Sequence, residues 1–428
     1  MRYLLTISCN RLYAPVHGEG NKVDMRSGNL IIVQGGGPTA VLNSSLASAI
    51  AEGIGQQKIG RIFGARHGME GLVRADLVEL GQMTSQELQL LGNSPGAALG
   101  SSRFKPTEDD LEDMVGHLRR LDLRYMLFMG GNGTMRGAEM VSRFCREAGF
   151  EVQIVAVPKT VDNDIAGTDR CPGYASAARF VAQSTRDLGM DLRSLPQPVT
   201  ILETMGRSVG WLAASSTLGK VEQDDAPHLV YLPETPFHID RFLSELDEIL
   251  TRQGWAVVVV SEGIREQNGR PVYEMKEPAQ ADSLARPMTG GVGQFLATMV
   301  GLDLKIRCRS EKPGLLARAS MVHLSAQDRL DAELVGRAGV RALASGETGK
   351  MVALRGLVSP AGNADDDGYD LVPLDAVTEV ERSLPEQWLT GGPLAVGREF
   401  RAYLQPLVGE LCRYAPAFAP AIPGIGGL

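Results

Sequence analysis

The densest group of polar side chains in the chain follows a short apolar run and reads Pro158-Lys159-Thr160-Val161-Asp162-Asn163-Asp164. In an extended segment, Asp162 and Asp164 stand two residues apart and point to one side. One carboxylate could then hold Mg²⁺ while the other accepts a proton. The structural alternative is an Asx-rich turn with a solvated lysine. Two further motifs with compatible chemistry favour the catalytic interpretation.

Two glycine-rich turns each separate an apolar run from a helical pattern: Gly35-Gly36-Gly37-Pro38-Thr39-Ala40 and Gly130-Gly131-Asn132-Gly133-Thr134. Glycine lets the backbone approach an anion closely, and the start of a helix supplies unpaired N–H groups. Each turn alone could be only a tight connection. Asn132 offers a carbonyl oxygen to Mg²⁺, although asparagine in a turn often only tolerates unusual backbone angles. Together the two turns predict a site for phosphate groups.

The elements that position these motifs form an alternating pattern. Short β-branched runs are separated by stretches with helical spacing, which is typical of βαβ units and a mostly parallel sheet. Ligands of such sheets bind beyond the carboxyl ends of the strands, where all three motifs lie. A capping pair, Thr107 with Asp110, predicts a helix to about Arg120. The predicted strands are 30–33, 125–128, 152–157, 199–202, 228–232 and 256–260, and further helices are expected at about 42–52 and 237–253.

Length and composition limit the class of protein. The chain has 428 residues, 43% of them hydrophobic, and 43 Lys and Arg against 51 Asp and Glu give a net charge of −8. This is an acidic globular composition with room for two or three domains, so disordered and disulfide-scaffold classes are excluded. The acidic balance argues against a general nucleic-acid binder. Five scattered cysteines without a CxxC pair indicate no zinc site and favour a reducing cytoplasmic location.

The order of the motifs resembles the phosphofructokinase family. The glycine turns and the 158–164 segment are followed by Met205-Gly206-Arg207 and Ser261-Glu262-Gly263, while Gly100-Ser101-Ser102-Arg103-Phe104 is similar to a phosphate-contacting segment of that family. The resemblance covers nearly everything from Asn29 to about Gly356. It implies transfer of a phosphoryl group to the 1-hydroxyl of fructose 6-phosphate with Mg²⁺. The acidic composition and the absence of a long apolar run in the sequence predict that neither nucleic acid nor a membrane is a partner.

The resemblance also implies a role for each matching position. Asp162 would be the general base, with Lys159 and Gly133 beside it in the catalytic group. The donor would lie on Gly36, Gly37, Arg103 and Gly131, and Mg²⁺ on Asn132 and Asp164. The sugar phosphate would contact Thr160, Asp162, Met205, Gly206, Arg207, Glu262, Arg309, Leu315 and Arg318.

Lys159 bears on the phosphoryl donor. Members that use ATP generally have glycine at this position, and members that use pyrophosphate carry lysine. An ammonium group here occupies space near the α-phosphate of a nucleotide and can neutralise a departing phosphate. Gly133 points the other way, since many pyrophosphate users have aspartate there, and Gly137 is small as in ATP users. We give Lys159 more weight and expect pyrophosphate, which would make the reaction reversible and useful in both glycolysis and gluconeogenesis.

Three positions depart from the family pattern. Asn132 replaces a more usual acidic residue, Leu315 stands where a histidine or tyrosine commonly reaches the sugar phosphate, and Pro198 lies about where ATP users have an arginine from a neighbouring subunit. Arg193 or the Arg307–Arg309 pair could compensate. Family members complete their sites across subunits, so a homodimer or homotetramer is expected.

The predicted fold class is α/β, with two doubly wound, mostly parallel-sheet domains and the active site in the cleft between them. Residues 1–27 are interpreted as a flexible extension, 28–172 as the donor domain, 173–318 as the sugar-phosphate domain, and 319–428 as contributing to both. The alternatives are an ATP-dependent kinase, a relative of NAD and diacylglycerol kinases, and a catalytically silent regulatory subunit that binds sugar phosphate. Sedoheptulose 7-phosphate could share the sugar pocket.

Overall fold

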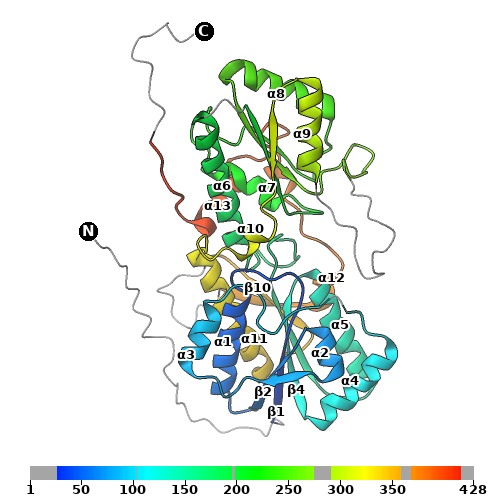
Figure 1. Ribbon diagram of the computed structural model, residues 1–428. Coiled ribbons are helices and arrows are strands. Elements are labelled where there is room, and N and C mark those ends of the chain that lie inside the picture. The colour runs from blue at the N-terminus through cyan, green and yellow to red at the C-terminus, as the bar shows by residue number, and fades with distance from the viewer. Residues whose placement is uncertain (1–26, 103, 195–197, 274–290, 358–367, 416–428) are drawn as a thin grey trace, which may run out of the picture.

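The computed structural model describes residues 27–102, 104–194, 198–273, 291–357 and 368–415. The described chain forms two bodies, each built on its own β-sheet (Figure 1). Almost all of the predicted N-terminal extension lies outside the described residues, as does Arg103. Among the described helices, none is long and apolar enough to cross a membrane.

The first sheet has seven strands in the order β11-β10-β5-β4-β1-β2-β3. Its inner strands run parallel, while β3 and β11 pair antiparallel at the two edges. The inner strands carry β-branched and other apolar side chains on both faces, and these side chains are buried, as a parallel sheet requires. The strands are β1 (Gly28–Gln34), β2 (Ile59–Ala65), β3 (Leu77–Glu79), β4 (Leu123–Gly130), β5 (Gln153–Pro158), β10 (Lys350–Leu354) and β11 (Tyr369–Pro373).

Helices cover both faces of the first sheet (Figure 1). Leu30 and Ile32 of β1 belong to one buried cluster, and Ile31 and Val33 belong to another on the opposite face. One face is covered by α1 (Leu42–Gly55), α3 (Ser85–Gly92) and α11 (Ala326–Ser345). The other is covered by α2 (Met69–Arg74), α4 (Glu108–Arg120), α5 (Asn132–Glu147) and α12 (Leu374–Thr378).

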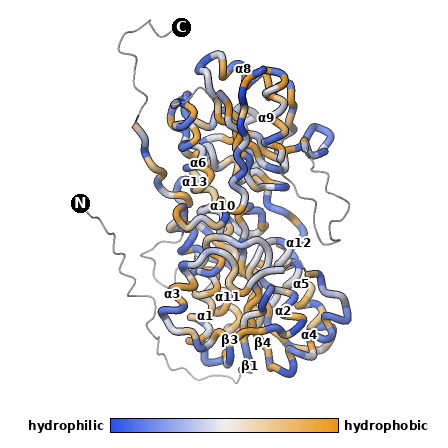
Figure 2. The backbone as a smooth tube through the Cα atoms, in the orientation of Figure 1, coloured by the Kyte–Doolittle hydropathy of each residue, from blue (hydrophilic) through white to orange (hydrophobic). Residues whose placement is uncertain are grey.

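The second sheet has four parallel strands in the order β7-β8-β6-β9. They are β6 (Val199–Thr204), β7 (Leu229–Tyr231), β8 (Ala256–Ser261) and β9 (Cys308–Glu311). One face packs on α6 (Tyr174–Ser194), α7 (Trp211–Ser215) and α13 (Arg398–Val408), and the other on α8 (Ile239–Gln253) and α9 (Val292–Asp303). Hydrophobic residues concentrate in the interior of each body (Figure 2).

The α/β class with two mostly parallel sheets is confirmed, and so are the six predicted strands. The predicted cap of α4 is also present, because Thr107 Oγ1 accepts the Asp110 N–H while the Asp110 carboxylate accepts the Thr107 N–H. One boundary was wrong: α5 begins at Asn132, so Asn132 and Gly133 lie in the first helical turn rather than in the loop before it.

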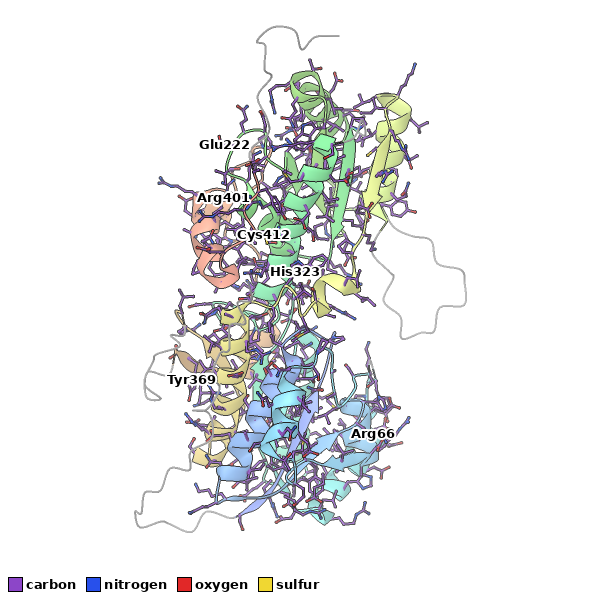
Figure 3. All side chains as sticks on the ribbon, turned by 60° about the vertical axis from the view of Figure 1, so that its left-hand side comes forward. Arg66, Glu222, His323, Tyr369, Arg401 and Cys412 are labelled. Carbon is purple, nitrogen blue, oxygen red and sulfur yellow. The ribbon has the colours of Figure 1, made fainter. Side chains whose placement is uncertain are left out.

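The last part of the chain links the two bodies. After the short helix α10 (Leu315–Ala319), α11 packs along α1 and leads into β10 and β11 of the first sheet, and α13 then returns to α6. Asp328 of α11 accepts N–H groups from Gly173 and Ser176 at the start of α6, at 2.7 and 3.0 Å. His323 lies at the junction of the two bodies, with its ring 5.0 Å from that of Phe180 (Figure 3).

Candidate active site

The parallel register brings the predicted donor motifs to one edge of the first sheet. Strand β4 pairs with both β1 and β5, so the segments that follow these strands are neighbours. Gly35 N–H donates to Met129 O at 2.8 Å, and Lys159 N–H donates to Gly130 O at 2.9 Å. The 130–134 turn therefore lies between the 35–40 turn and the start of the 158–164 segment.

The glycines leave room for close packing of polar groups. Gly36 has φ of 73°, in the region that favours glycine, and a Cβ there would lie 3.3 Å from Lys159 Nζ and 3.8 Å from Gly131 N. A Cβ on Gly37 would lie 2.8 Å from Arg318 Nη1. We call Gly36, Gly37 and Gly131 the glycine cradle. Its neighbours, Lys159 and Arg318, supply the local positive charge that the acidic composition lacks.

Lys159 is the cation at the centre of this arrangement. Its side chain is only 2% exposed, and Nζ donates to Gly37 O. Burial and, to a smaller extent, repulsion from Arg318 lower the pKa of the Lys159 ammonium to about 8, although Asp162 and Asp164 oppose the shift. The ammonium is thus held beside the cradle with less solvation than a surface lysine has.

Asp162 has the opposite perturbation. Burial raises the pKa of its carboxyl to about 7, with repulsion from Asp164 and Glu262 adding to the shift and Lys159 and Arg207 opposing it. Its Oδ1 atom is buried and has no hydrogen-bond partner in the described chain. A carboxylate with a pKa near neutrality and a free oxygen is suited to accept a proton.

The backbone between the two aspartates is not extended, so that prediction was wrong. Asn163 has φ of 56°, a left-handed conformation that is uncommon for a residue with a side chain. Its fully buried side chain stabilises the turn, since Oδ1 accepts the Cys171 N–H at 2.9 Å and Nδ2 donates to the Tyr403 hydroxyl at 3.0 Å. Asp162 N–H donates to Thr160 Oγ1 at 3.1 Å.

Asn132 and Asp164 are in direct contact. Asn132 Nδ2 donates to Asp164 Oδ2 at 2.9 Å and to the Asp164 carbonyl at 3.3 Å. Burial raises the pKa of the Asp164 carboxyl, while hydrogen bonds from Thr160 and Asn132 counteract the shift. The remaining oxygens, Asn132 Oδ1 and Asp164 Oδ1, are buried without a hydrogen-bond partner in the described chain. Unpaired buried oxygens of this kind suit a hard cation such as Mg²⁺.

The predicted sugar motifs lie at the carboxyl edge of the second sheet. Thr204 and Ser261 are opposite each other at the ends of β6 and β8, and Glu262 N–H donates to Thr204 O at 2.9 Å. Gly206 has φ of 127°, and a Cβ there would lie 2.5 Å from Val209 O. The next residue, Arg207, carries one of the charges that act on Asp162, so this edge faces the aspartate segment.

Other predicted sugar contacts lie elsewhere. Arg309 is exposed on the edge strand β9, opposite Thr200 and therefore four residues before the carboxyl end of β6. Leu315 is 66% exposed on α10. Arg318 lies against Gly37 of the glycine cradle. Arg193, considered as a compensating arginine, donates to Asp225 Oδ1 at 3.1 Å instead.

Sequence reasoning missed a buried carboxylate behind the sugar motifs. Glu203 of β6 is 1% exposed, and its oxygens accept the N–H groups of Gly291 and Gly293 at the start of α9. Lys312 Nζ pairs with Glu203 at 2.9 Å and lies 3.9 Å from Glu262. The start of α9 thus receives a cap from the Glu203 side chain, which the sequence alone could not reveal.

A cavity of about 490 Å³ lies between α6 and the segment that joins β9 to α10. The cradle, the aspartates and Arg207 do not line it. Its walls combine apolar and charged side chains: Phe180, Ser184, Asp187, Leu188, Asp191, Leu202, Glu311, Lys312, Pro313 and Leu316. The cavity therefore adjoins the sugar side through Lys312 but is separate from the aspartate segment.

A glycine cradle, a buried cation and paired carboxylates at facing sheet edges define a site for phosphoryl transfer. The chain belongs to the phosphofructokinase family, whose model matches residues 29–343.

Several named relatives and one solved structure are similar to this chain over most of its length. A pyrophosphate–fructose 6-phosphate 1-phosphotransferase from Rhodospirillum rubrum is 34% identical, covering 90% of this chain and 95% of its own. A sulfofructose kinase from Alkalicoccus urumqiensis is 33% identical, covering 84% of this chain and 91% of its own. An ATP-dependent 6-phosphofructokinase from Streptomyces coelicolor is 30% identical, covering 76% of this chain and 90% of its own. The crystal structure of a pyrophosphate-dependent phosphofructokinase from Nitrosospira multiformis superposes with a TM-score of 0.79 at 30% identity, covering 93% of this chain and 95% of that one.

Proposed function

We propose that this protein transfers a phosphoryl group reversibly from pyrophosphate to the 1-hydroxyl of fructose 6-phosphate, giving fructose 1,6-bisphosphate and phosphate. The observation that carries the proposal is Lys159, a buried ammonium between the glycine cradle and Asp162. Relatives named for pyrophosphate and fructose 6-phosphate support it, at 34% identity over 90% of the chain.

In the forward step, the 1-hydroxyl oxygen attacks the terminal phosphorus of pyrophosphate while the bridging P–O bond breaks and phosphate leaves. Asp162 accepts the hydroxyl proton. Lys159 neutralises charge on the departing phosphate, and the N–H groups of the glycine cradle orient the donor. Phosphoryl transfer depends mostly on such positioning and charge neutralisation, so these residues supply the main requirements of the reaction.

Mg²⁺ is the expected cofactor, and the residues present fit it. Asn132 and Asp164 each have a buried oxygen without a hydrogen-bond partner in the described chain. Among the described residues, no three histidine, cysteine or acidic side chains gather as a metal site. This agrees with Mg²⁺, which typically binds one or two protein oxygens together with waters and substrate phosphates. When bound, the ion would neutralise charge on the donor phosphates.

The sugar phosphate is proposed to bind across the two sheet edges. Thr160, Met205, Gly206 and Arg207 would contact it, and Glu262 would accept hydrogen bonds from its hydroxyls. The exposed position of Arg309 supports a role in a second subunit of a homodimer or homotetramer rather than in its own site. We divide the chain accordingly into a donor domain (28–172), a sugar-phosphate domain (173–318) and a region serving both (319–428).

ATP remains the second candidate donor because of one specific observation. A Cβ on Gly133 would have no neighbouring atom within 4 Å, so open space lies beside this residue. Lys159 still favours pyrophosphate, since its charge acts on the leaving group as well as on the space available to a nucleotide.

The test is a coupled assay of purified protein with fructose 6-phosphate and Mg²⁺, supplied in parallel with pyrophosphate or ATP. We expect turnover with pyrophosphate and release of pyrophosphate in the reverse direction from fructose 1,6-bisphosphate and phosphate. Turnover with ATP alone would overturn the donor assignment. Sugar-phosphate binding without turnover of either donor would identify a regulatory subunit. Sedoheptulose 7-phosphate in place of fructose 6-phosphate tests the acceptor length.

A further inference from the structure

We propose that Arg382 and Tyr403, from the last part of the chain, are positioning residues that hold the loop carrying Asp162 and Asp164 in its reactive shape. The inference rests on the proposed function only in taking these two carboxylates as the reacting groups. Neither residue belongs to a motif that the sequence singled out.

The first observation concerns Asn163, which lies between the two aspartates in a left-handed conformation. A residue with a side chain keeps such a conformation only when its surroundings stabilise it. Tyr403 supplies one such contact, because its hydroxyl accepts Asn163 Nδ2 at 3.0 Å and donates to Asp169 O at 2.9 Å. Arg382 supplies another, as its Nη1 donates to Asn163 O at 3.3 Å.

The second observation is that Arg382 also fixes the next residue. Its backbone N–H donates to Asp164 O at 2.8 Å, and the preceding Glu381 forms an antiparallel bridge with Ile165. The segment 381–382 thus lies along the outgoing half of the aspartate loop like a short strand. Together with the Asn163 contacts, it restrains the backbone on both sides of the Asp164 side chain.

The third observation ties the same arginine to the sugar side. The Arg382 guanidinium lies 4.3 Å from the ring centroid of Trp211, and Trp211 Nε1 donates to Arg382 O at 3.1 Å. Trp211 is fully buried and begins α7, a few residues after Met205-Gly206-Arg207. Arg382 therefore connects the segment that carries the proposed base with the segment that carries the proposed sugar contacts.

Removing these contacts should change the chemical step more than substrate binding. Misplacement of a reacting group by about 1 Å can lower a rate roughly 100-fold. We therefore expect Tyr403→Phe and Arg382→Ala to lower kcat by about 10- to 100-fold, while KM for both substrates stays within about twofold. Arg382→Lys keeps the cation over Trp211 and should recover part of kcat.

The experiment measures kcat, KM, thermal unfolding and amide hydrogen exchange in peptides spanning residues 159–171. Trp388→Phe is the matched control, because Trp388 packs against the Tyr403 ring with 5.2 Å between centroids and so tests loss of aromatic packing. We expect faster exchange in Tyr403→Phe and Arg382→Ala, and exchange and kcat near wild type in Trp388→Phe.

Three results would overturn the inference: unchanged kcat and exchange in both variants, a loss of activity that only follows loss of folded protein, or an equal loss of kcat in Trp388→Phe. Hydrogen exchange does not depend on turnover. If the wild-type protein used neither donor, the proposed function would fail while the exchange data still decided whether Arg382 and Tyr403 hold the loop.

Discussion

At the scale of single residues, the site holds two ionisable groups whose pKa values are shifted toward each other. Burial raises the pKa of Asp162 to about 7 and lowers that of Lys159 to about 8. Both pKa values therefore lie close to neutral pH, where each group can gain or lose its proton. A base and a cation that operate near neutrality fit a reaction that must run in both directions.

Asp162→Asn should lower kcat by about 100- to 10,000-fold, since the hydroxyl proton then has no acceptor. The fold should remain intact, because the amide replaces the carboxylate without a change of size. Steady-state assays beside circular dichroism measure both effects. Activity within a few-fold of wild type would exclude Asp162 as the base.

The same substitution should stabilise the protein above neutral pH. The folded-state pKa of Asp162 lies above that of an unfolded aspartate, so between about pH 4 and 7 only the unfolded chain has released the proton. From this group, the free energy of unfolding falls by up to about 1.4 kcal/mol per pH unit in that interval. When it is measured by denaturant unfolding, the free energy of unfolding should decline less between pH 5 and pH 8 in Asp162→Asn than in wild type.

The pH dependence of kcat/KM should be bell-shaped. The rate rises as Asp162 ionises near pH 7 and falls as Lys159 loses its proton near pH 8. Lys159→Met should remove the falling limb and lower kcat/KM for pyrophosphate by about 10- to 100-fold, because a charge on the leaving group is no longer neutralised. Lys159→Gly should weaken pyrophosphate use similarly. Unchanged pyrophosphate rates in both variants would refute the donor assignment.

At the scale of elements, a buried carboxylate of α11 holds the start of α6. Asp328 is 1% exposed and accepts hydrogen bonds from Gly173 N, Ser176 N and Ser176 Oγ. Asp328→Ala should lower the free energy of unfolding by about 2–3 kcal/mol, since buried N–H groups lose a charged acceptor. Asp328→Asn keeps one side-chain oxygen as an acceptor, so it should lower the free energy of unfolding by less than Asp328→Ala does. Equal unfolding midpoints for wild type and Asp328→Ala would contradict this role.

The sequence predicted six strands in which most residues are apolar, and it missed β2 and β3. It missed β9, which reads Cys308-Arg309-Ser310-Glu311, because an edge strand need not be apolar. It missed β10 and β11, which join the first sheet only after the chain has passed through the second body. Periodicity describes local burial and carries no information on such long-range pairing.

The sequence predicted those parts of the site in which a motif directly follows a strand. Lys159, Gly36 and Gly131 meet because three adjacent parallel strands end together. The conformation of Asn163 was not predictable from the motif, since it depends on Arg382 and Tyr403. These residues are 219 and 240 positions away in the chain.

At the scale of the whole molecule, exposed apolar side chains bear on assembly. Leu315 and Leu316 are 66% and 70% exposed on α10, beside the cavity between α6 and β9. For the homodimer or homotetramer proposed above, Leu316→Asp should lower the oligomeric mass measured by light scattering, because a charge there would oppose burial against a second copy. Val221→Asp, at a site 77% exposed on another segment, is the matched control. An unchanged mass in Leu316→Asp would remove α10 from the interface.

The interleaved path of the chain also has a consequence for biosynthesis. The first sheet needs β10 and β11, and all four strands of the second sheet lie between these strands and β5 in the sequence. A ribosome must therefore release the whole second sheet before the first sheet can close. During translation, β5 has an open edge that a nascent neighbour or a chaperone could occupy.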